Sequence, residues 1–494
     1  MAIPNNSQNS NISNISPVMG NEKPSPLDFD EFVPWACSQW QTSTTIKVER
    51  LIQEDLIKYE KRKPSRAPTL RLKTEDGDDH PTKSTVQYIE NFDGMNNTIL
   101  IKAYYDHRGK VVEVSIDAPS VDIHRKLIQA FSICFPFQPL LTKLSIRRGL
   151  KDYVIYDIGK LLPLTNITDL CLDDTFVPEG NYYVLLDYVS QLKHLSLSRC
   201  KINDNIVEKL TERMINGRPG SKCLQTLNLS SNFITDLGSL PLANMLRTNR
   251  SLIYLNLASN RVTDVGASLI LDTMKSFPLT YEEILDTKRG RIDYIKSKEE
   301  VYRKCLDDIV ARRQRVKDDV INISLMSSKN TGNPAAKQEK QKKFRSKSFA
   351  ESILESPSEL AHTMVSELVH EFENPFDYEH TFKDKDGYVH CIGNLKLCYL
   401  NLSYNSLEYP AIAKLLNVIK YQCSLVQKPL NCTGLLKVLL DGNNLPITCP
   451  ELDHIESLLN SLNSQRVSAL TKSRVASGVK AISRMSVSRS AIFR

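Results

Sequence analysis

The chain has 494 residues, of which 41% are hydrophobic, 24% charged and 7% aromatic, and its formal net charge is +7. This balance is typical of a soluble protein with a sizeable core and excludes collagen-like, mucin-like and disulfide-rich scaffolds. The longest apolar run, residues 127–137, is broken by polar residues and by Pro136, so the sequence predicts no membrane span. We expect a cytoplasmic, reducing setting, because no secretory signal is visible and the 11 cysteines have no regular spacing.

Two regions precede the repetitive part of the sequence. Residues 1–29 are rich in Asn, Ser and Pro and predict a disordered tail. Residues 30–135 predict an α+β region that caps the first repeat, with an independent binding domain as the alternative. Within it, residues 98–105 and 110–116 alternate apolar and polar side chains around Asp106-His-Arg-Gly109, which indicates a β-hairpin, and residues 121–134 read as a helix.

The pattern L-x-x-L-x-L-x-x-N/C-x-L recurs along the chain and indicates one short strand per repeat. Complete copies begin at Leu192, Leu224 and Leu252, and weaker copies begin at Leu141 and Ile167. Two further copies begin at Leu397 and Leu435. The sequence therefore predicts five repeats in residues 136–280 and two in residues 391–464, with a C-terminal cap helix at residues 451–462.

The spacing of the repeats indicates what connects their strands. Consecutive copies in the first block begin 25 to 32 residues apart, which leaves room for a helix after each strand. The segment Asn260-Arg-Val-Thr-Asp-Val-Gly-Ala resembles the ribonuclease-inhibitor type of leucine-rich repeat. We therefore predict an α/β fold, a horseshoe-shaped leucine-rich-repeat solenoid of alternating strands and helices.

A long insertion separates the two blocks of repeats, because Leu397 follows Leu252 by 145 residues. Residues 281–390 predict a charged insertion that is partly helical, at 281–320 and 348–372, and partly disordered. It contains a basic cluster with the following members: Lys340, Lys342, Lys343 and Arg345. Residues 465–494 predict a basic tail. Both segments could contact an acidic surface, such as the acidic tails of microtubules, or could be solvated charge without a partner.

Several short motifs carry a more specific resemblance. They are Val177-Pro-Glu-Gly-Asn181, Asn374-Pro375, Asp386-Gly-Tyr-Val389, Gly393-Asn-Leu-Lys-Leu397 and Cys449-Pro450. Together with the split array of repeats over residues 141–450, they resemble the leucine-rich repeat-containing protein 71 family. The resemblance implies a non-catalytic scaffold that binds proteins, in a cilium or flagellum axoneme.

The strand residues between the repeat leucines are the candidate binding residues, because the horseshoe would turn them toward its concave face. Tyr and Arg among them would suit a protein interface, whereas a mixed polar face that binds nothing is the alternative. The candidates are Arg147, Asp169, Asp173, Asp174, His194, Arg199, Tyr254, Asn256, Tyr399, Asn401 and Tyr404.

The sequence offers no recognisable catalytic or cofactor motif. Residues 217–222 lack the order of a phosphate-binding loop, and no G-x-S-x-G or Cys/His nucleophile setting is present. His362, His370, His380 and His390 are spaced too widely for a typical zinc site. We expect no enzyme activity, no cofactor, no metal and no small-molecule substrate.

Two other functions remain as alternatives to the scaffold. Regulation of a small GTPase, as by the activator of Ran, would use an early-loop residue such as Arg147, Arg148 or Asn166. Binding of nucleic acid by the basic segments ranks last, since they lack interleaved aromatic residues for base stacking.

Overall fold

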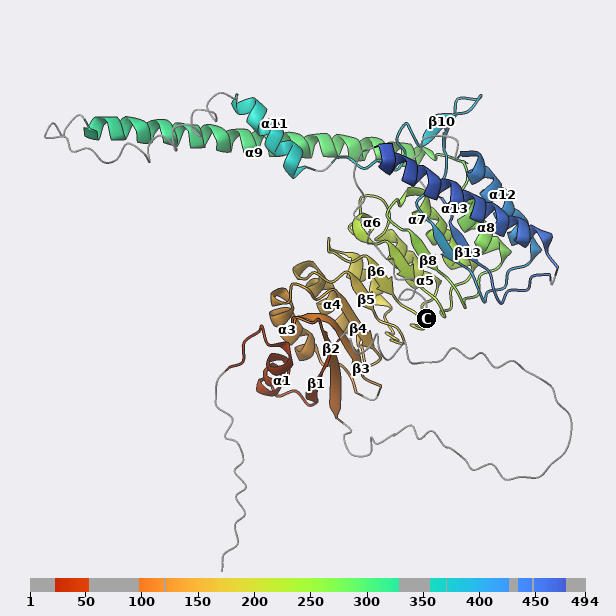
Figure 1. The fold of residues 1–494 in the computed structure, drawn as a ribbon, viewed down its shortest axis with the longest axis horizontal. Helices are drawn as coiled ribbons and strands as arrows, with labels where there is room; N and C mark the ends of the chain where they lie inside the picture. The colour runs from red at the N-terminus through yellow and green to blue at the C-terminus, as the bar shows by residue number, and fades with distance from the viewer. Residues whose placement is uncertain are drawn as a thin grey trace, which may run out of the picture.

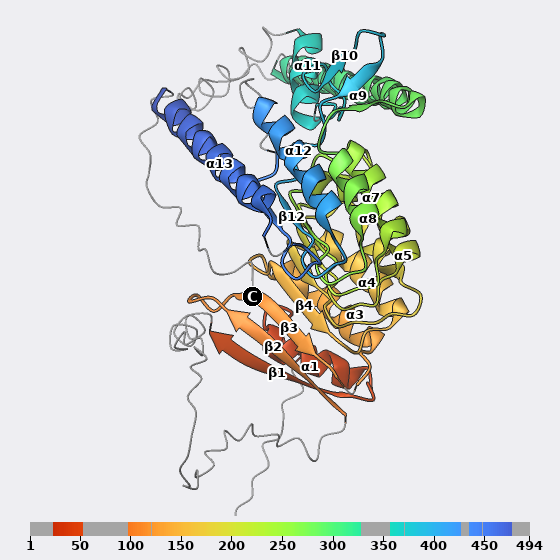
Figure 2. The same ribbon diagram turned by 90° about the vertical axis from the view of Figure 1, so that its right-hand side faces the viewer.

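The computed structural model describes residues 23–52, 97–119, 121–327, 356–369, 371–425, 434–446 and 448–476. One ten-stranded sheet, β1-β2-β3-β4-β5-β6-β7-β8-β12-β13, follows the order of the chain. Helices line one face of this sheet, and a separate helical arm projects from its C-terminal half (Figures 1 and 2).

The N-terminal region contributes the first three strands. Its elements are α1 (Phe29–Gln39), β1 (Thr45–Ile52), β2 (Thr98–Tyr105), β3 (Val111–Asp117), α3 (Arg125–Cys134) and η1 (Phe135–Phe137). The predicted hairpin is confirmed, because β2 and β3 pair in antiparallel. Strand β1 was not predicted from the sequence, and it pairs in parallel with β2 across an intervening segment of more than 40 residues. Strand β3 then pairs in parallel with β4, so this region extends the sheet of the repeats.

The predicted end of the N-terminal tail at residue 29 is wrong. Residues 23–29 have a defined path, on which the Leu27 carbonyl accepts a hydrogen bond of 2.9 Å from the Gln138 side chain. Phe29 is fully buried, with its ring 6.0 Å from those of Phe131 and Phe135. Three aromatic rings therefore stabilise this stretch, a contact that its polar composition did not suggest. Residues 1–22 lie outside the described residues.

Each predicted repeat has one strand. The seven are β4 (Lys143–Arg147), β5 (Asp169–Cys171), β6 (His194–Ser196), β7 (Thr226–Asn228), β8 (Tyr254–Asn256), β12 (Tyr399–Asn401) and β13 (Lys437–Leu439). All pair in parallel, and their middle residues are aligned from Leu144 to Val438. The repeated leucine spacing thus gives an α/β repeat fold with a parallel sheet.

Helices follow these strands. They are α4 (Asp152–Leu161), η2 (Leu162–Leu164), η3 (Asn181–Leu186), α5 (Asp204–Glu212), α6 (Gly220–Cys223), α7 (Asp236–Thr248), α8 (Asp264–Asp272), α12 (Tyr409–Leu425) and α13 (Pro450–Ala476). The N-termini of α5, α7 and α8 are capped by Asn203, Thr235 and Thr263, whose side chains accept backbone N–H bonds. The second repeat differs, because its helix η3 is of the 3₁₀ type.

The asparagines of the repeat motif form a buried hydrogen-bonded row. Asn232 Oδ1 accepts bonds of 3.0 Å from the N–H groups of Cys200 and Ile202. Its Nδ2 donates to the carbonyls of Leu197 and Leu229, both at 2.9 Å. Each asparagine therefore satisfies the turn of its own repeat and that of the repeat before it. The other members are Asn260, Asn405 and Asn443.

The row continues across the insertion. β12 pairs in parallel with β8, although 142 residues separate Asn256 from Tyr399. Asn405 donates to the Leu257 carbonyl at 2.9 Å and accepts from the Val262 N–H at 3.1 Å. The last two repeats therefore continue the sheet of the first five.

The insertion contains one long helix and a small sheet. α9 (Tyr281–Ser327) projects beyond the repeats, and α11 (Pro357–Leu368) packs against its middle (Figure 1). Ala361 and Val365 of α11 are buried against Cys305 of α9. The sequence analysis missed the three-stranded sheet of β9 (Phe277–Pro278), β10 (Thr381–Lys383) and β11 (Val389–Cys391).

The insertion is fastened to the repeats at the C-terminal end of α7. Arg247 binds the Glu283 carboxylate through two bonds of 2.7 and 2.8 Å, and it lies 4.0 Å from the Phe277 ring. Burial is the largest single influence and favours the neutral form of Glu283, but the bonds and charge of Arg247 together with the bonds from Thr280 outweigh it and lower the Glu283 pKa. The base of α9 is therefore tied to the array by a partly buried ion pair.

The C-terminal helix is longer than predicted. α13 runs to Ala476, so the boundary of the basic tail at residue 465 is wrong, and residues 477–494 lie outside the described part. In the described part of the chain no helix has the length and apolar character needed to cross a membrane.

Candidate protein-binding face

The face of the sheet away from the helices presents the residues on either side of each buried middle leucine. We call it the strand face. One row across β4 to β12 consists of Lys143, Asp169, His194, Thr226, Tyr254 and Tyr399. The next row consists of Ser145, Cys171, Ser196, Asn228, Asn256 and Asn401. The period of two along each strand places both rows on the same side.

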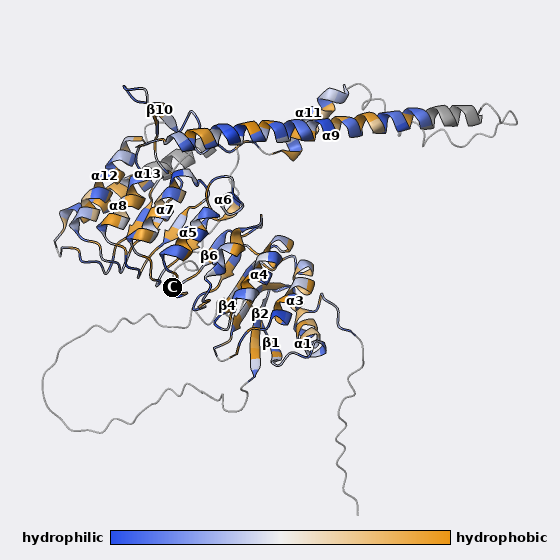
Figure 3. Ribbon diagram, turned by 180° about the vertical axis from the view of Figure 1, so that it is seen from behind, coloured by the Kyte–Doolittle hydropathy of each residue, from blue (hydrophilic) through white to orange (hydrophobic). Residues whose placement is uncertain are grey.

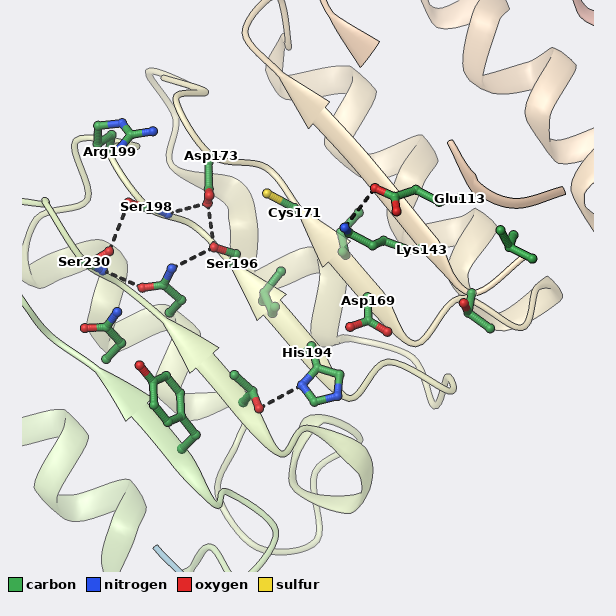
Figure 4. A pocket seen from close by; sticks show the side chains of 18 residues that line it. Glu113, Lys143, Asp169, Cys171, Asp173, His194, Ser196, Ser198, Arg199 and Ser230 are labelled. Atoms are coloured by element: carbon green, nitrogen blue, oxygen red, sulfur yellow. Dashed lines mark hydrogen bonds and ion pairs between the residues drawn. The ribbon is translucent and has the colours of Figure 1, made fainter. Parts of the chain in front are cut away.

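A hollow of about 990 Å³ lies on the strand face and extends from β3 to β8 (Figure 4). Side chains of six consecutive strands line it, and most of them are polar. No described residue of the insertion is among those that line it. The described part of the insertion therefore leaves this face open, which the sequence alone left undecided.

An ion pair marks the N-terminal end of the hollow. Lys143 Nζ lies 2.8 Å from a carboxylate oxygen of Glu113 on β3. Burial is the largest single influence and would lower the pKa of Lys143, but the bond to Glu113 and the charges of Glu113, Cys171 and Asp169 together raise the pKa above its usual value. Lys143 is therefore held as a cation whose charge is largely compensated.

The centre of the hollow combines an imidazole, a hydroxyl and two carboxylates. His194 Nδ1 lies 2.8 Å from Thr226 Oγ1, and Asp169 accepts a bond of 2.5 Å from the neighbouring Thr168 hydroxyl. Among the described residues neither Asp169 nor Asp173 has an ion-pair partner within 4.0 Å. The hollow therefore offers carboxylates to an incoming donor.

Asp173 also organises the neighbouring strands. It accepts bonds from the Ser196 hydroxyl at 2.6 Å and from the Ser198 N–H at 2.9 Å. Ser196 in turn accepts from Asn228 at 2.9 Å, and Ser230 donates to Ser198 at 3.0 Å. Figure 4 shows this chain of bonds running across three strands. These polar groups are preorganised, which reduces the cost of ordering them when a partner binds.

Asp174 lies in the turn after β5 and joins two arginines. It adopts a positive φ of 61° and binds Arg199 and Arg147. The Arg199 hydrogen bond, assisted by Arg147, holds the Asp174 pKa well below its usual value despite partial burial. The cluster bridges three consecutive repeats.

Asp174→Asn is expected to lower the free energy of unfolding at pH 7 by less than about 1 kcal/mol, because both arginines are half exposed and the pairs are screened. Asn tolerates the positive φ, so the backbone stays unstrained. Because folding lowers this pKa, the stabilisation is present above the ordinary value near 3.8 and is lost as the pH falls through the folded value. Urea unfolding of both proteins at pH 7 and below pH 4 checks this: a difference that grew in acid would contradict it.

The tyrosines of the prediction have different surroundings. Tyr254 is only 8% exposed, and burial raises its pKa to about 12 while a hydrogen bond with Asn401 opposes the rise. Tyr254 therefore offers little surface to a partner, and the ring of Tyr399 lies 6.2 Å from its own. Tyr399 is 37% exposed and Tyr404 is 64% exposed.

The hollow unites only some of the predicted residues. Those that line it are Asp169, Asp173, His194, Arg199, Tyr254 and Asn256. Those outside its lining are Arg147, Asp174, Tyr399, Asn401 and Tyr404. The sequence analysis did not select Glu113, because it precedes the repeats, or Ser196 and Thr226, although their strand positions match those of selected residues.

The other residues singled out in the sequence have local partners in the described part of the chain. Arg148 is bound by Asp117 through bonds of 2.8 and 2.5 Å, and Asn166 donates to the Pro139 carbonyl. His380 and His390 bind Asp377 and Asp384 respectively. No group of three or more metal-ligating side chains occurs in the described part. The basic cluster Lys340, Lys342, Lys343 and Arg345, like His370, lies outside the described residues.

Comparison with known proteins bears on the repeats alone. A comparison with curated proteins finds no match to this chain. A family model described as Leucine Rich repeat matches residues 191–210, 220–243 and 248–271. These segments contain β6, β7 and β8, the strands at the C-terminal side of the hollow. The chain therefore contains leucine-rich repeats, which are typically protein-binding modules without catalytic activity.

Proposed function

We propose that this protein is a non-enzymatic scaffold that binds a protein partner through the strand face. In this proposal the repeats form a horseshoe with the strand face on its concave side, and the N-terminal region and α13 cap its two ends. The observation that carries the proposal is the polar hollow of about 990 Å³, to which six consecutive strands contribute. A surface built from several repeats suits a macromolecule better than a small substrate.

The chemistry of the hollow supports a polar protein contact. Asp169 and Asp173 can accept hydrogen bonds, and the His194–Thr226 pair can both donate and accept. Charge-assisted bonds of this kind add specificity to an interface. The partially exposed Tyr399 lies beside the hollow as an aromatic contact.

The setting of the scaffold is part of the same proposal. The resemblance to the leucine-rich repeat-containing protein 71 family favours a cytoplasmic location and a ciliary or flagellar axoneme, with microtubule-associated proteins as partners. The basic cluster at residues 340–345 and the basic C-terminal segment would then provide secondary contacts.

The double variant Asp169→Arg/Thr226→Arg is expected to lose its protein partner, because two long cations fill the hollow and remove a carboxylate. The measurement is quantitative recovery of proteins from ciliated cells by proximity labelling. The matched control is Asn205→Arg/Glu208→Arg, which makes the same change in charge on exposed positions of α5. We expect at least about a tenfold loss for the first variant, equivalent to 1.4 kcal/mol, and no loss for the control.

Equal recovery by both variants would contradict binding at the strand face. Recovery of axonemal proteins supports the proposed setting, and recovery of small GTPases or RNA-bound proteins instead would overturn it. Thermal unfolding of both variants checks that they fold. We expect both to fold, since every substituted side chain is at least partly exposed.

A further inference from the structure

A second surface lies on α9, between its base and its contact with α11. Along residues 291–300 every side chain is exposed except that of Tyr294. Ile292 and Ile295 are 52% and 56% exposed, although both are large apolar residues. Tyr281 and Val310, also exposed, fall with them in one sector of about 60° at about 100° per residue. Exposed apolar residues thus form a stripe along a single side of the helix.

The helix is held at several points, which fix the orientation of this stripe. Arg247 anchors the first turn of α9 through Glu283, and α11 packs from Val301 onward, where it also covers Leu306 on the side of the stripe. Between these points, Phe372 of the returning chain packs against Tyr294 with ring centroids 5.6 Å apart. The segment 289–298 is therefore a supported helix with one open apolar side.

The borders of the stripe are basic on both sides. In the heptad that places Ile292 and Ile295 at positions a and d, the flanking e and g positions hold the following residues: Arg289, Arg291, Lys296 and Lys298. Arg291, Lys296 and Lys298 have no ion pair among the described residues. The carboxylate within the stripe, Glu299, is bound to Arg303 at 3.2 Å. The open borders therefore carry uncompensated positive charge.

We propose that this face of α9 binds an acidic amphipathic helix of a partner protein as a short coiled coil. Its apolar residues would pack on Ile292 and Ile295, and its carboxylates would pair with the basic borders. A second copy of the chain does not fit, because parallel or antiparallel pairing would place basic borders against each other. A membrane surface fits less well, since the stripe has the narrow width of a coiled-coil seam.

The test uses the full chain and synthetic helical peptides of about four heptads. The first peptide carries leucine at a and d and glutamate at e and g; the second replaces the glutamates by lysine; the third keeps the glutamates and replaces the leucines by serine. We expect fluorescence anisotropy to show binding of the first peptide at least about tenfold tighter than that of the other two.

Variants locate the binding on α9. Ile292→Gln/Ile295→Gln is expected to weaken binding of the acidic peptide at least tenfold, whereas Ser297→Gln/Ala311→Gln, at exposed positions on the opposite side, leaves it unchanged. Lys296→Glu/Lys298→Glu is expected to shift the preference toward the lysine peptide.

Four results would overturn the proposal. They are equal binding of all three peptides, unchanged binding by the isoleucine variant, binding of anionic lipid vesicles without any peptide binding, and self-association of the chain through this face in sedimentation velocity. The inference is independent of the strand face, because the hollow is lined by β3 to β8 and the surface proposed on α9 lies within residues 289–298.

Discussion

Substitution of Asn232 by leucine is expected to lower the free energy of unfolding by about 3 to 5 kcal/mol. The side chain is 4% exposed, and leucine of similar size would leave its partners in place without hydrogen bonds. Two N–H groups, of Cys200 and Ile202, and the carbonyls of Leu197 and Leu229 would lose a partner. Each buried group left unsatisfied costs about 1 to 3 kcal/mol, reduced where other bonds or water compensate.

Urea unfolding of the full chain, followed by far-UV circular dichroism, measures this effect. Asn205→Leu serves as the control, because Asn205 is exposed on α5 and its replacement should change the stability by less than about 0.5 kcal/mol. If the two variants unfolded at the same urea concentration, the buried asparagine row would not stabilise the repeats as inferred.

Substitution of Asn394 by leucine is expected to separate the last two repeats from the first five. Asn394 is fully buried and donates to the carbonyls of Leu246 at 2.8 Å and Asn249 at 3.1 Å. It also accepts bonds from the N–H groups of Lys396 and Leu397. We expect a loss of about 2 to 4 kcal/mol, concentrated at the junction of β8 and β12.

Hydrogen exchange distinguishes this local effect from general unfolding. Amides of β12 and α12 should exchange faster in Asn394→Leu, while those of β5 and β6 keep the wild-type rates, because repeats are stabilised mainly by their neighbours. The matched control is Asn417→Leu, at an exposed position of α12. Uniformly faster exchange in all repeats would contradict a junction that depends on Asn394.

The repeat spacing was sufficient to predict every strand of the repeats, which are β4 to β8, β12 and β13. A leucine at a fixed interval must be buried on each strand, and the interval sets the length of the connecting segment. The boundaries were less accurate where composition alone was available. The polar stretch before Phe29 is ordered by aromatic residues that lie about 100 positions later, which no local pattern reveals.

The missed strands have partners that are distant in sequence. β1 pairs with β2 although more than 40 residues lie between them in the sequence. β11 pairs with β9 across more than 100 residues. Strands of three residues or fewer, such as β9 and β10, carry too few side chains to show a clear alternation.

The sequence predicts which residues of the candidate site lie on the strands, but not how exposed their side chains are or which residues they contact. The register correctly places Asp169 and His194 side by side across adjacent strands. It does not show that Tyr254 is covered or that Asp174 turns to bind two arginines, because both depend on the exact path of neighbouring side chains. Residues at equivalent strand positions therefore differ in solvent exposure, because the exposure of each side chain depends on its neighbours in the folded protein.

The most direct test of the strand face is hydroxyl-radical footprinting of the full chain with and without the partner recovered by proximity labelling. Tyr399 reports on the strand face at 37% exposure, and Tyr153 and Tyr156 report on α4 at 42% and 40%. We expect the partner to slow oxidation of His194 and Tyr399 and to leave the two α4 tyrosines unchanged. Protection of Tyr153 and Tyr156 with unchanged oxidation at His194 and Tyr399 would contradict this expectation.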